Sequence, residues 1–497
     1  MTSPTEAALA TDLAGALGAA GYTYDEVAAL LGTTAHAALL RNETTPGERA
    51  TRGGSALETL VRLWLLQLPV TAAAADEALP GLVDRLCAAS ILERSVGEVA
   101  ARVDVRPYGT DSDNLWIASD LTPGLDGSPN RVGADHVLGI SSAATSLAEL
   151  TVRAPVGRAL DLGTGCGVQS LHLAGHARHV VATDVNPRAL RLTRFNAALN
   201  GVDLDVRDGS FFEPVRGEQF DLVVSNPPFV ISPATGERLV YRDSGLPGDR
   251  VVEHIVRTAP DHLTEGGVCQ VLANWMILRD QPWDERLAGW VEGCDAWVVQ
   301  REICDLPTYV ELWLKDAGMH PSTGAGKGAE YRHRYDTWLA WLEEQGAEAV
   351  GFGWVNLRRT DAEPVLRLEN WPYDVQMPLG DEVAAHFRRT TLLRETTDEA
   401  LLATRLVTPA DVRQEMLGAP GAEDPSQIVL RRRRGVRRAR QVDTVEAGLV
   451  GACDGELSVA QILAALADLL GGDPEAVRAA GITGVRELVA EGFLDPA

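Results

Sequence analysis

A glycine-rich turn between an apolar run and a helical stretch constrains this chain more than any other feature. The run from Arg158 to Leu162 has the length of a β-strand and ends in Gly163-Thr164-Gly165-Cys166-Gly167. Glycines between a strand and a helix permit a tight turn and let a ligand approach the backbone closely. The stretch therefore predicts a strand, a ligand-binding turn and a helix, in that order.

Two later apolar runs also end in polar residues. Val180 to Thr183 ends at Asp184, and Phe220 to Ser225 ends at Asn226. Helical stretches separate the runs, and this alternation is typical of a parallel sheet wound with helices. Ligands of such sheets bind beyond the carboxyl ends of the strands. The sequence therefore predicts an α/β fold in which the turn, Asp184 and Asn226 share one edge of the sheet.

Three acidic residues near that edge indicate a cofactor that contains adenosine. Asp184 is placed to accept hydrogen bonds from ribose hydroxyls, and Asp208, after a strand predicted at Asp203 to Val206, from an adenine amino group. A nicotinamide dinucleotide requires the spacing G-x-G-x-x-G, but the third glycine, Gly167, comes one residue early. S-adenosylmethionine fits the pattern better, because Asp161 can accept from the amino end of its methionine part.

Two motifs carry a resemblance to a known family. Asp161-Leu162-Gly163-Thr164-Gly165-Cys166-Gly167 resembles the first motif of class I S-adenosylmethionine-dependent methyltransferases. Asn226-Pro227-Pro228-Phe229 resembles the fourth motif of those that methylate planar nitrogens, a group that includes the release-factor glutamine methyltransferases and several base-modifying enzymes. The resemblance covers roughly Gly133 to Arg301, about a third of the chain. It implies a Rossmann-like sheet, S-adenosyl-L-methionine as cofactor, and cofactor contacts from Asp161, Gly163, Thr164, Gly165, Gly167, Asp184, Asp208 and Asn226.

The fourth motif predicts how a methyl group would be transferred. An amide or aromatic amine nitrogen is a poor nucleophile because its lone pair is delocalised. The side-chain oxygen of Asn226 and the carbonyl of Pro227 can each accept a hydrogen bond from the target N–H. Phe229 can stack on the flat target group, so the expected catalytic residues are Asn226, Pro227, Pro228 and Phe229. The alternative for Asn226 is an ordinary turn residue before two prolines.

Two segments beside the core motifs supply further candidates. Tyr241 and Arg242 lie in a glycine- and acid-rich stretch that resembles one in the release-factor enzymes, so we expect them to face the substrate. A solvated loop is the alternative. Ser142 and Thr145 precede the first motif and are candidates to lie across the cofactor, with a helix N-cap as the alternative.

The remaining sequence divides into predicted modules. The N-terminal part is helical and ends in a strand, a turn and a strand from Ala101 to Ala118, which resembles a winged helix. In methyltransferases such a module often supports dimerisation, so a homodimer through it is an expectation. The predicted domains are a winged-helix-like domain at 1–121, a methyltransferase domain at 131–367 with a helical insertion at 307–346, a strand and helix extension at 368–440, and a second small winged-helix-like domain at 441–497.

Charge bears on the substrate. The chain has 70 acidic and 45 basic residues and a net charge of −25, so it repels phosphate backbones at long range. Seven arginines between 431 and 440 either grip phosphate or form a hairpin paired with the chain's own acids, and we favour the hairpin. A protein, peptide or small amide-bearing substrate is therefore favoured over a nucleobase of RNA or DNA. An alternative from a different class of function is a regulatory or scaffold protein whose methyltransferase core is degenerate.

The cysteines and the start of the chain indicate a cytoplasmic location. The six cysteines are scattered and form no C-x-x-C pair, which favours free thiols in a reducing compartment over structural zinc. His172 and His176 share a helix face but have no neighbouring carboxylate or cysteine, so we expect no metal. The first residues do not resemble a signal peptide, and no apolar run reaches membrane-spanning length.

Overall fold

The structure is a computed structural model that describes residues 4–110, 114–127, 133, 135–233, 245–319, 327–420 and 425–497. The chain divides into two compact units. The first unit comprises Met1–Ala148 and Ala154–Asn370, and the second comprises Glu149–Arg153 and Trp371–Ala497.

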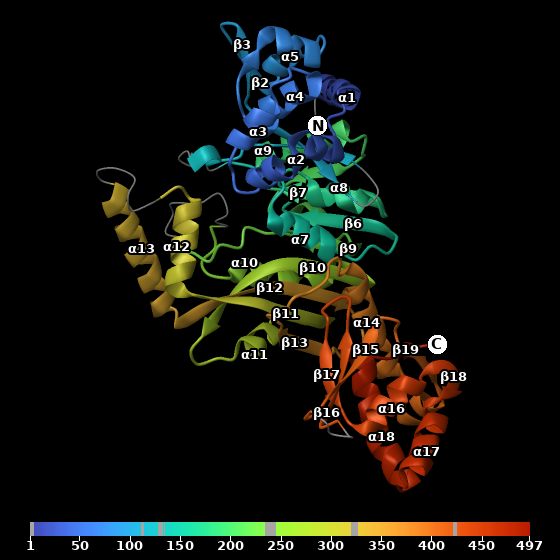
Figure 1. The fold of residues 1–497 in the computed structure, drawn as a ribbon. Helices are drawn as coiled ribbons and strands as arrows, with labels where there is room; N and C mark the ends of the chain where they lie inside the picture. The colour runs from blue at the N-terminus through green and yellow to red at the C-terminus, as the bar shows by residue number, and fades with distance from the viewer. Residues whose placement is uncertain are drawn as a thin grey trace. The chain divides into compact units, whose positions relative to one another are not determined.

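An eight-stranded sheet forms the centre of the first unit (Figure 1). Its strands lie in the order β13-β11-β12-β10-β9-β6-β7-β8, and all neighbours are parallel except β12, which is antiparallel to β10 and β11. The predicted α/β fold is confirmed. The strands are β6 (Val156–Leu162), β7 (Ala177–Asp184), β8 (Asp205–Asp208), β9 (Phe220–Ser225), β10 (Leu263–Leu278), β11 (Cys294–Asp305), β12 (Ala347–Arg359) and β13 (Leu366–Asn370).

Two hydrophobic clusters pack the helices of this unit. One contains sheet residues such as Leu160 and Val223 together with α10 (Arg250–Thr258) and α11 (Trp283–Ala288). The other joins α8 (Val168–Ala174) and α9 (Pro187–Leu199) to the N-terminal module. Because that second cluster is continuous, the N-terminal module and the helices that follow the glycine turn share one core.

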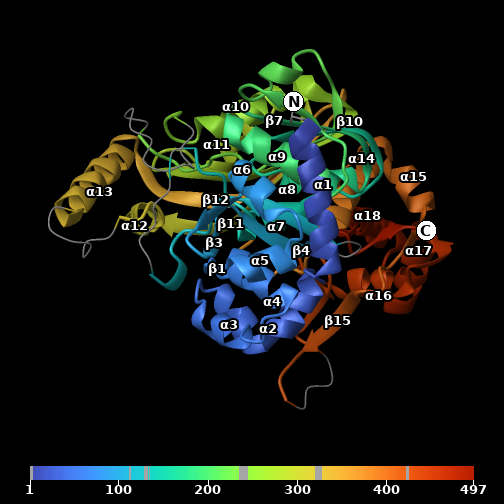
Figure 2. The ribbon, with the colours of Figure 1, turned by 90° about the horizontal axis from the view of Figure 1, so that it is seen from above.

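The N-terminal module consists of helices, a three-stranded sheet and a separate hairpin. The helix α1 lies against α9 (Figure 2). The three-stranded sheet has the order β1-β3-β2, and among the described strands β4 pairs with β5 alone. The elements are α1 (Pro4–Ala19), α2 (Tyr24–Leu39), α3 (Thr45–Ala50), α4 (Ala56–Leu60), the π-helix η1 (Val61–Leu65), β1 (Val70–Thr71), α5 (Ala72–Ala78), α6 (Val83–Ala88), β2 (Leu92–Ser95), β3 (Glu98–Ala101), β4 (Asp104–Gly109), β5 (Asn114–Ser119) and the 3-10 turn η2 (Leu125–Gly127).

The structure differs from the sequence-based interpretation of this module in its β-hairpins and in one short helix. The predicted hairpin exists as β4–β5, but it does not join the three-stranded sheet. The hairpin that pairs with β1 is β2–β3, which the sequence does not predict because each strand has four residues and only one of them is buried. The polar segment from Arg41 to Ser55 contains the short helix α3, which has a proline in its first turn. The winged-helix assignment itself stays a prediction.

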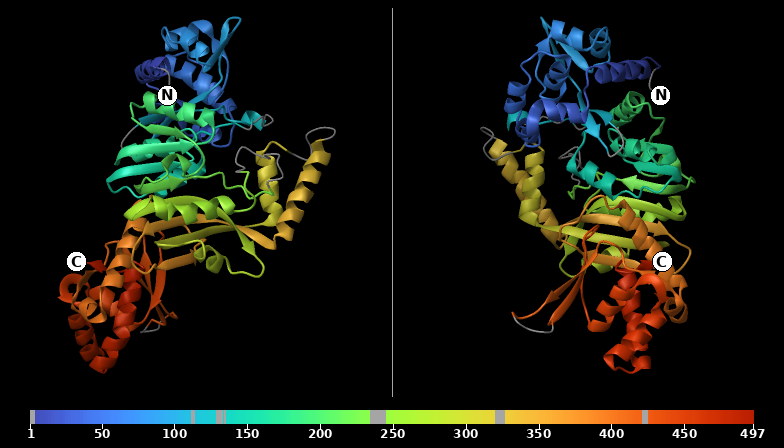
Figure 3. Two further views of the ribbon diagram at one scale, coloured as in Figure 1. Left: turned by 180° about the vertical axis from the view of Figure 1, so that it is seen from behind. Right: turned by 45° about the vertical axis from the view of Figure 1, so that its right-hand side comes forward.

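The helical insertion at 307–346 is present between β11 and β12. Its helices are α12 (Leu306–Asp316) and α13 (Lys327–Glu344), which lie side by side (Figure 3). Tyr309, Trp313 and Trp338 are buried in the core that these helices form with Val230 and Ile231. The other short elements of the unit are α7 (Ser142–Leu150), which runs into the second unit, η3 (Glu213–Val215) and η4 (Ala259–His262).

The second unit has two small sheets and a helical core. One sheet has the order β18-β14-β19 and the other β15-β16-β17. Residues 441–497 are mostly helical, and their assignment as a separate domain stays a prediction. The elements are α14 (Gly380–Glu395), α15 (Asp398–Ala403), β14 (Arg405–Val407), β15 (Val412–Leu417), β16 (Gln427–Arg432), β17 (Ala439–Val442), α16 (Thr444–Ala452), β18 (Asp454–Ser458), α17 (Val459–Leu470), α18 (Pro474–Ala490) and β19 (Asp495–Pro496).

The arginine-rich segment forms the hairpin β16–β17, as predicted. Arg431 pairs with Glu415 at 2.8 Å, Arg432 with Asp411 at 2.8 Å, and Arg440 with Glu446 at 2.9 Å. The guanidinium of Arg438 lies 4.5 Å from the centre of the Trp371 ring. The three arginines that are exposed and form no ion pair within the described part of the chain are Arg433, Arg434 and Arg437.

Candidate functional site

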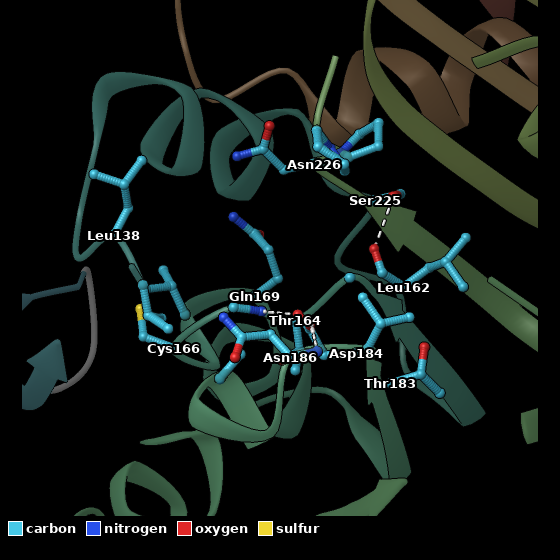
Figure 4. Close-up of a pocket in the computed structure, with 18 of the residues that line it drawn as sticks. Leu138, Leu162, Thr164, Cys166, Gln169, Thr183, Asp184, Asn186, Ser225 and Asn226 are labelled. Carbon is cyan, nitrogen blue, oxygen red and sulfur yellow. Dashed lines mark hydrogen bonds between the residues drawn. The ribbon is translucent and has the colours of Figure 1, made fainter. Parts of the chain in front are cut away.

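A cavity of about 710 Å³ opens at the carboxyl ends of β6, β7 and β9 (Figure 4). Residues that follow these three strands line it, among them Gly163 to Gly165, Asp184 and Asn226. The sequence predicted that the three strand ends would meet at one edge, and the structure brings them together around a single space. The volume is that of a site for a small molecule or cofactor.

The glycine turn presents its backbone to this cavity. The N–H groups of Gly163 and Thr164 both donate to the carbonyl of Thr183, at 2.9 Å each, which ties the turn to β7. Gly163 and Gly165 have φ values of 77° and 58°, a region that side chains disfavour. Apart from each glycine and its two chain neighbours, no atom of the described residues lies within 4 Å of the position that a Cβ of Gly163 or Gly165 would occupy, so a ligand can approach the backbone there.

Asp184 is held at the end of β7 by two backbone groups. Its Oδ2 accepts from the Gly165 N–H at 2.9 Å, and its Oδ1 accepts from the Asn186 N–H at 2.8 Å. Burial raises the pKa of this carboxyl, against the lowering effect of the two hydrogen bonds. The side chain therefore has a fixed position on the cavity wall, where its remaining lone pairs can accept hydrogen bonds from ribose hydroxyls.

Asp161 holds the glycine turn through hydrogen bonds to its carboxyl. Its Oδ2 accepts from the Thr164 hydroxyl at 2.7 Å and from the N–H and hydroxyl of Ser170 at 2.9 Å and 2.6 Å. The carboxyl is 1% exposed, and burial raises its pKa from 3.8 to about 6. Asp161 is absent from the described cavity lining, so its direct contact with a cofactor stays a prediction. The structure shows that it joins the turn to the start of α8.

Other predicted residues lie close to the cavity rather than in its described lining. Asp208 ends β8, and the cavity wall there is formed by the next three residues, Gly209 to Phe211. Near α7 the wall is formed by Ser141, Ala143 and Ala144, while Ser142 and Thr145 do not line it. Their cofactor contacts stay predictions, as do the substrate contacts of Tyr241 and Arg242, which lie outside the described residues.

The fourth motif forms the wall opposite the glycine turn. Asn226, Pro227, Pro228 and Phe229 all line the cavity. The Oδ1 of Asn226 is buried and has no hydrogen-bond partner among the described residues. A buried carbonyl oxygen without a partner costs about 1–3 kcal/mol. Such an atom at the cavity wall is the expected arrangement for an acceptor that serves a ligand.

The helical insertion holds the chain directly after this motif. The Ile231 N–H donates to the hydroxyl of Tyr309 at 2.8 Å, and the Ile231 carbonyl accepts from the indole N–H of Trp338 at 2.8 Å. The ring of Phe229 meets that of Trp313 edge to face, with centroids 6.1 Å apart. The insertion therefore packs against the fourth motif and supports it.

Two parts of the cavity wall were not predicted from the sequence. The segment Asp135 to Gly139 lines the cavity and is tied back by paired hydrogen bonds between Asp120 and Val137. Gln169 projects from α8 between the glycine turn and Asn226 and donates to the Ala144 carbonyl at 2.7 Å (Figure 4). A glutamine in the first turn of a helix has no distinctive sequence signal, so only the folded arrangement identifies it.

The described lining fits an adenosine-containing sulfonium better than a pyrophosphate. It includes the carboxyls of Asp135 and Asp184 and the imidazole of His136, and it includes no lysine or arginine. A cavity with two carboxylates and no lysine or arginine in its described lining favours a cation. The open space beside the glycine turn, the Asp184 carboxyl and the Asn226 oxygen, which has no partner in the described part of the chain, together fit S-adenosylmethionine beside an N–H donor.

The sheet order and the two motifs are those of a class I methyltransferase. Residues 139–295 match the family model described as methyltransferase small domain, and this segment is therefore a domain of that family, with S-adenosylmethionine as its cofactor. Two further models, each described only as a domain of unknown function, match residues 19–102 and 384–496.

Three curated relatives match part of this chain. The release factor glutamine methyltransferase of Aquifex aeolicus is 39% identical over 125 residues, which cover 23% of this chain and 44% of the relative. The ribosomal RNA small subunit methyltransferase C of Salmonella arizonae is 35% identical over 131 residues, 26% of this chain and 34% of the relative. The ribosomal protein uL3 glutamine methyltransferase of Bradyrhizobium diazoefficiens is 30% identical over 154 residues, 28% of this chain and 48% of the relative. The chain thus spans between about a third and a half of the length of these relatives.

Proposed function

We propose that the protein is an S-adenosylmethionine-dependent N-methyltransferase that acts on a planar amide or amine nitrogen. The observation that carries the proposal is the buried Oδ1 of Asn226, which has no hydrogen-bond partner among the described residues and belongs to a residue that lines the same cavity as the glycine turn and Asp184. A degenerate core in a scaffold protein would have no reason to keep an unsatisfied acceptor at this place, because the atom destabilises the fold.

The bound cofactor supplies a methyl group on a positively charged sulfur. The residues of the chain bind and orient the reactants. The Asn226 oxygen and the Pro227 carbonyl each accept a hydrogen bond from the target N–H₂ group, which fixes the nitrogen and favours electron density on it. Phe229, held by Trp313, covers the flat face of the target group. No strong general base is required, and positioning together with fixed dipoles provides most of the acceleration.

For the substrate, we propose a protein, a peptide or a small molecule that carries an amide. The cavity lining supports this choice, because no lysine or arginine among its described residues would hold a phosphate. The arginine-rich hairpin supports it too, since four of its seven arginines are engaged with carboxylates or a tryptophan ring. Two of the three relatives named above are glutamine methyltransferases.

A nucleobase is the second candidate. It is favoured by the relative that is named as a ribosomal RNA methyltransferase and by the three exposed arginines at the β16–β17 turn. The fourth motif accepts a base amine as readily as a side-chain amide, because both present a flat N–H₂ group.

The test is methyl transfer from labelled S-adenosylmethionine to a cell extract separated into protein, RNA, DNA and small-molecule fractions. We expect label in the protein or small-molecule fraction with the wild-type chain and none with Asn226→Ala. Label that ribonuclease or deoxyribonuclease releases would establish a nucleobase substrate instead. If the wild type transfers no label to any fraction and does not bind the cofactor at millimolar concentration, the enzyme proposal is wrong.

A further inference from the structure

Two asparagines, Asn196 in α9 and Asn200 directly after it, form hydrogen bonds with the backbone of the hairpin β4–β5. Asn200 accepts from the Trp116 N–H at 2.9 Å and donates to the Trp116 carbonyl at 2.8 Å. Asn196 forms the same pair of bonds with Ala118, both at 2.8 Å. The two side-chain amides therefore continue the hydrogen bonding of strand β5, whose other edge pairs with β4.

Asn196 differs from Asn200 in one contact. Its amide nitrogen also donates to the carbonyl of Cys166 at 2.8 Å, and Cys166 is part of the glycine turn and lines the cofactor cavity. Asn196 is fully buried, with an exposed fraction of 0%. The amide nitrogen of Asn200 instead makes its second bond to the Asn196 carbonyl, within the same helix. Of the two asparagines, only Asn196 therefore connects the N-terminal hairpin with the turn.

Helix α9 contacts the turn at two more places. The hydroxyl of Thr193 donates to the Gly165 carbonyl at 2.9 Å. Gly167 has a φ of 88°, and a Cβ there would lie 3.1 Å from the side chain of Thr193, so the turn packs directly on the helix. Two successive carbonyls of the turn, those of Gly165 and Cys166, therefore accept hydrogen bonds from side chains of α9. The N–H of Gly165 donates to Asp184.

We propose that Asn196 is a positioning residue for the cofactor site, and that it couples docking of the N-terminal hairpin to cofactor affinity. The inference rests on the proposed function, because it takes the turn to be the cofactor site. The hydrogen bond from Asn196 fixes the position of the Cys166 carbonyl. Through the backbone of the turn it also fixes the geometry with which Gly165 and Asp184 bind the cofactor. Whatever displaces β5 from Asn196 weakens cofactor binding, and by linkage bound cofactor strengthens the attachment of the hairpin.

Asn196→Ala and Asn200→Ala form a matched pair for the test. Each removes an amide that binds the β5 backbone, and only the first removes the bond to the turn. We expect both variants to melt at lower temperature than the wild type. Calorimetry with S-adenosylmethionine should show that Asn196→Ala weakens binding about 10-fold, the order expected for one buried hydrogen bond, while Asn200→Ala changes the dissociation constant less than about 2-fold.

Alkylation of Cys166 gives a second measurement that does not depend on cofactor binding. The thiol is buried, and burial raises its pKa to about 12, so it reacts with iodoacetamide only when the turn opens. Peptide mass spectrometry should show faster labelling of Cys166 in Asn196→Ala but not in Asn200→Ala. Cys294, buried in the sheet, reports global unfolding in the same samples.

Several outcomes would overturn the inference. If both variants weaken cofactor binding equally, the effect follows from loss of hairpin docking and Asn196 has no separate role. If Asn196→Ala binds the cofactor as the wild type does, the turn does not depend on Asn196. Should this variant fail to fold, Thr193→Val, which removes only the hydroxyl bond to Gly165, must weaken binding instead. A wild type that binds no cofactor rejects the proposed function, whereas the labelling rates of Cys166 still decide whether Asn196 holds the turn.

Discussion

Replacement of Asn226 by alanine should lower the rate of methyl transfer without lowering the melting temperature. In the structure, the Oδ1 of Asn226 is buried and has no hydrogen-bond partner within the described residues. Removing that acceptor relieves a penalty of about 1–3 kcal/mol, which offsets the lost packing of a small side chain. We therefore expect Asn226→Ala to melt at the same temperature as the wild type or higher, although it removes a residue of the proposed active site.

The same substitution removes one of two acceptors that orient the target nitrogen. The Pro227 carbonyl remains, so the loss is that of one hydrogen bond to a group that gains positive charge, about 1.5–3 kcal/mol. This free energy corresponds to a decrease in turnover of roughly 10- to 150-fold. Affinity for S-adenosylmethionine should change little, because the turn and Asp184, on the opposite wall, are intact.

The assay combines three measurements on the wild type and the variant. Differential scanning fluorimetry gives the melting temperatures, calorimetry gives the affinity for S-adenosylmethionine, and single-turnover transfer of labelled methyl to the identified acceptor gives the rate. Full turnover by Asn226→Ala would refute the planar-nitrogen mechanism. A large fall in melting temperature would show that Asn226 is an ordinary structural turn residue, which is the alternative that the sequence leaves open.

Three further predictions follow from the site and from the arginine-rich hairpin. Asp184→Ala should weaken S-adenosylmethionine binding by roughly 1.5–3 kcal/mol in calorimetry, through loss of a charged acceptor, and unchanged affinity would remove Asp184 from the cofactor site. Because burial raises the pKa of Asp161 from 3.8 to about 6, its stabilising contribution is complete below pH 3.8 and is lost as the pH rises through 6. Asp161→Asn should flatten the dependence of melting temperature on pH over that window, and an identical profile would contradict the assignment. If the substrate is RNA gripped by the hairpin, replacing Arg433, Arg434 and Arg437 with alanine should reduce the log–log salt slope of binding by about 0.7 for each phosphate that the variant no longer neutralises. For a protein or small-molecule substrate we expect no change.

Much of the fold is determined by local patterns in the sequence. The apolar runs before Gly163, Asp184 and Asn226 predicted three parallel strands, and the structure confirms them as β6, β7 and β9. The prediction succeeds because strand periodicity, a glycine turn and a proline pair act over a few neighbouring residues. Since parallel strands end at the same edge of a sheet, the order of these signals also predicted where the cavity would lie.

The tertiary structure alone decided which partner each polar side chain has. The cofactor contact of Asp161 stays a prediction, and only the structure shows that its carboxyl accepts hydrogen bonds from Thr164 and Ser170. Asn196 carries no motif, and its role depends on Ala118 and Cys166, which lie 78 and 30 residues away in the chain. A hydrogen bond requires two groups within about 3 Å, and whether distant segments meet that condition depends on the packing of the whole unit. The sequence therefore determined the strands and the place of the site, and packing between distant segments decided which side chains bind the turn and which oxygen stays open to a ligand.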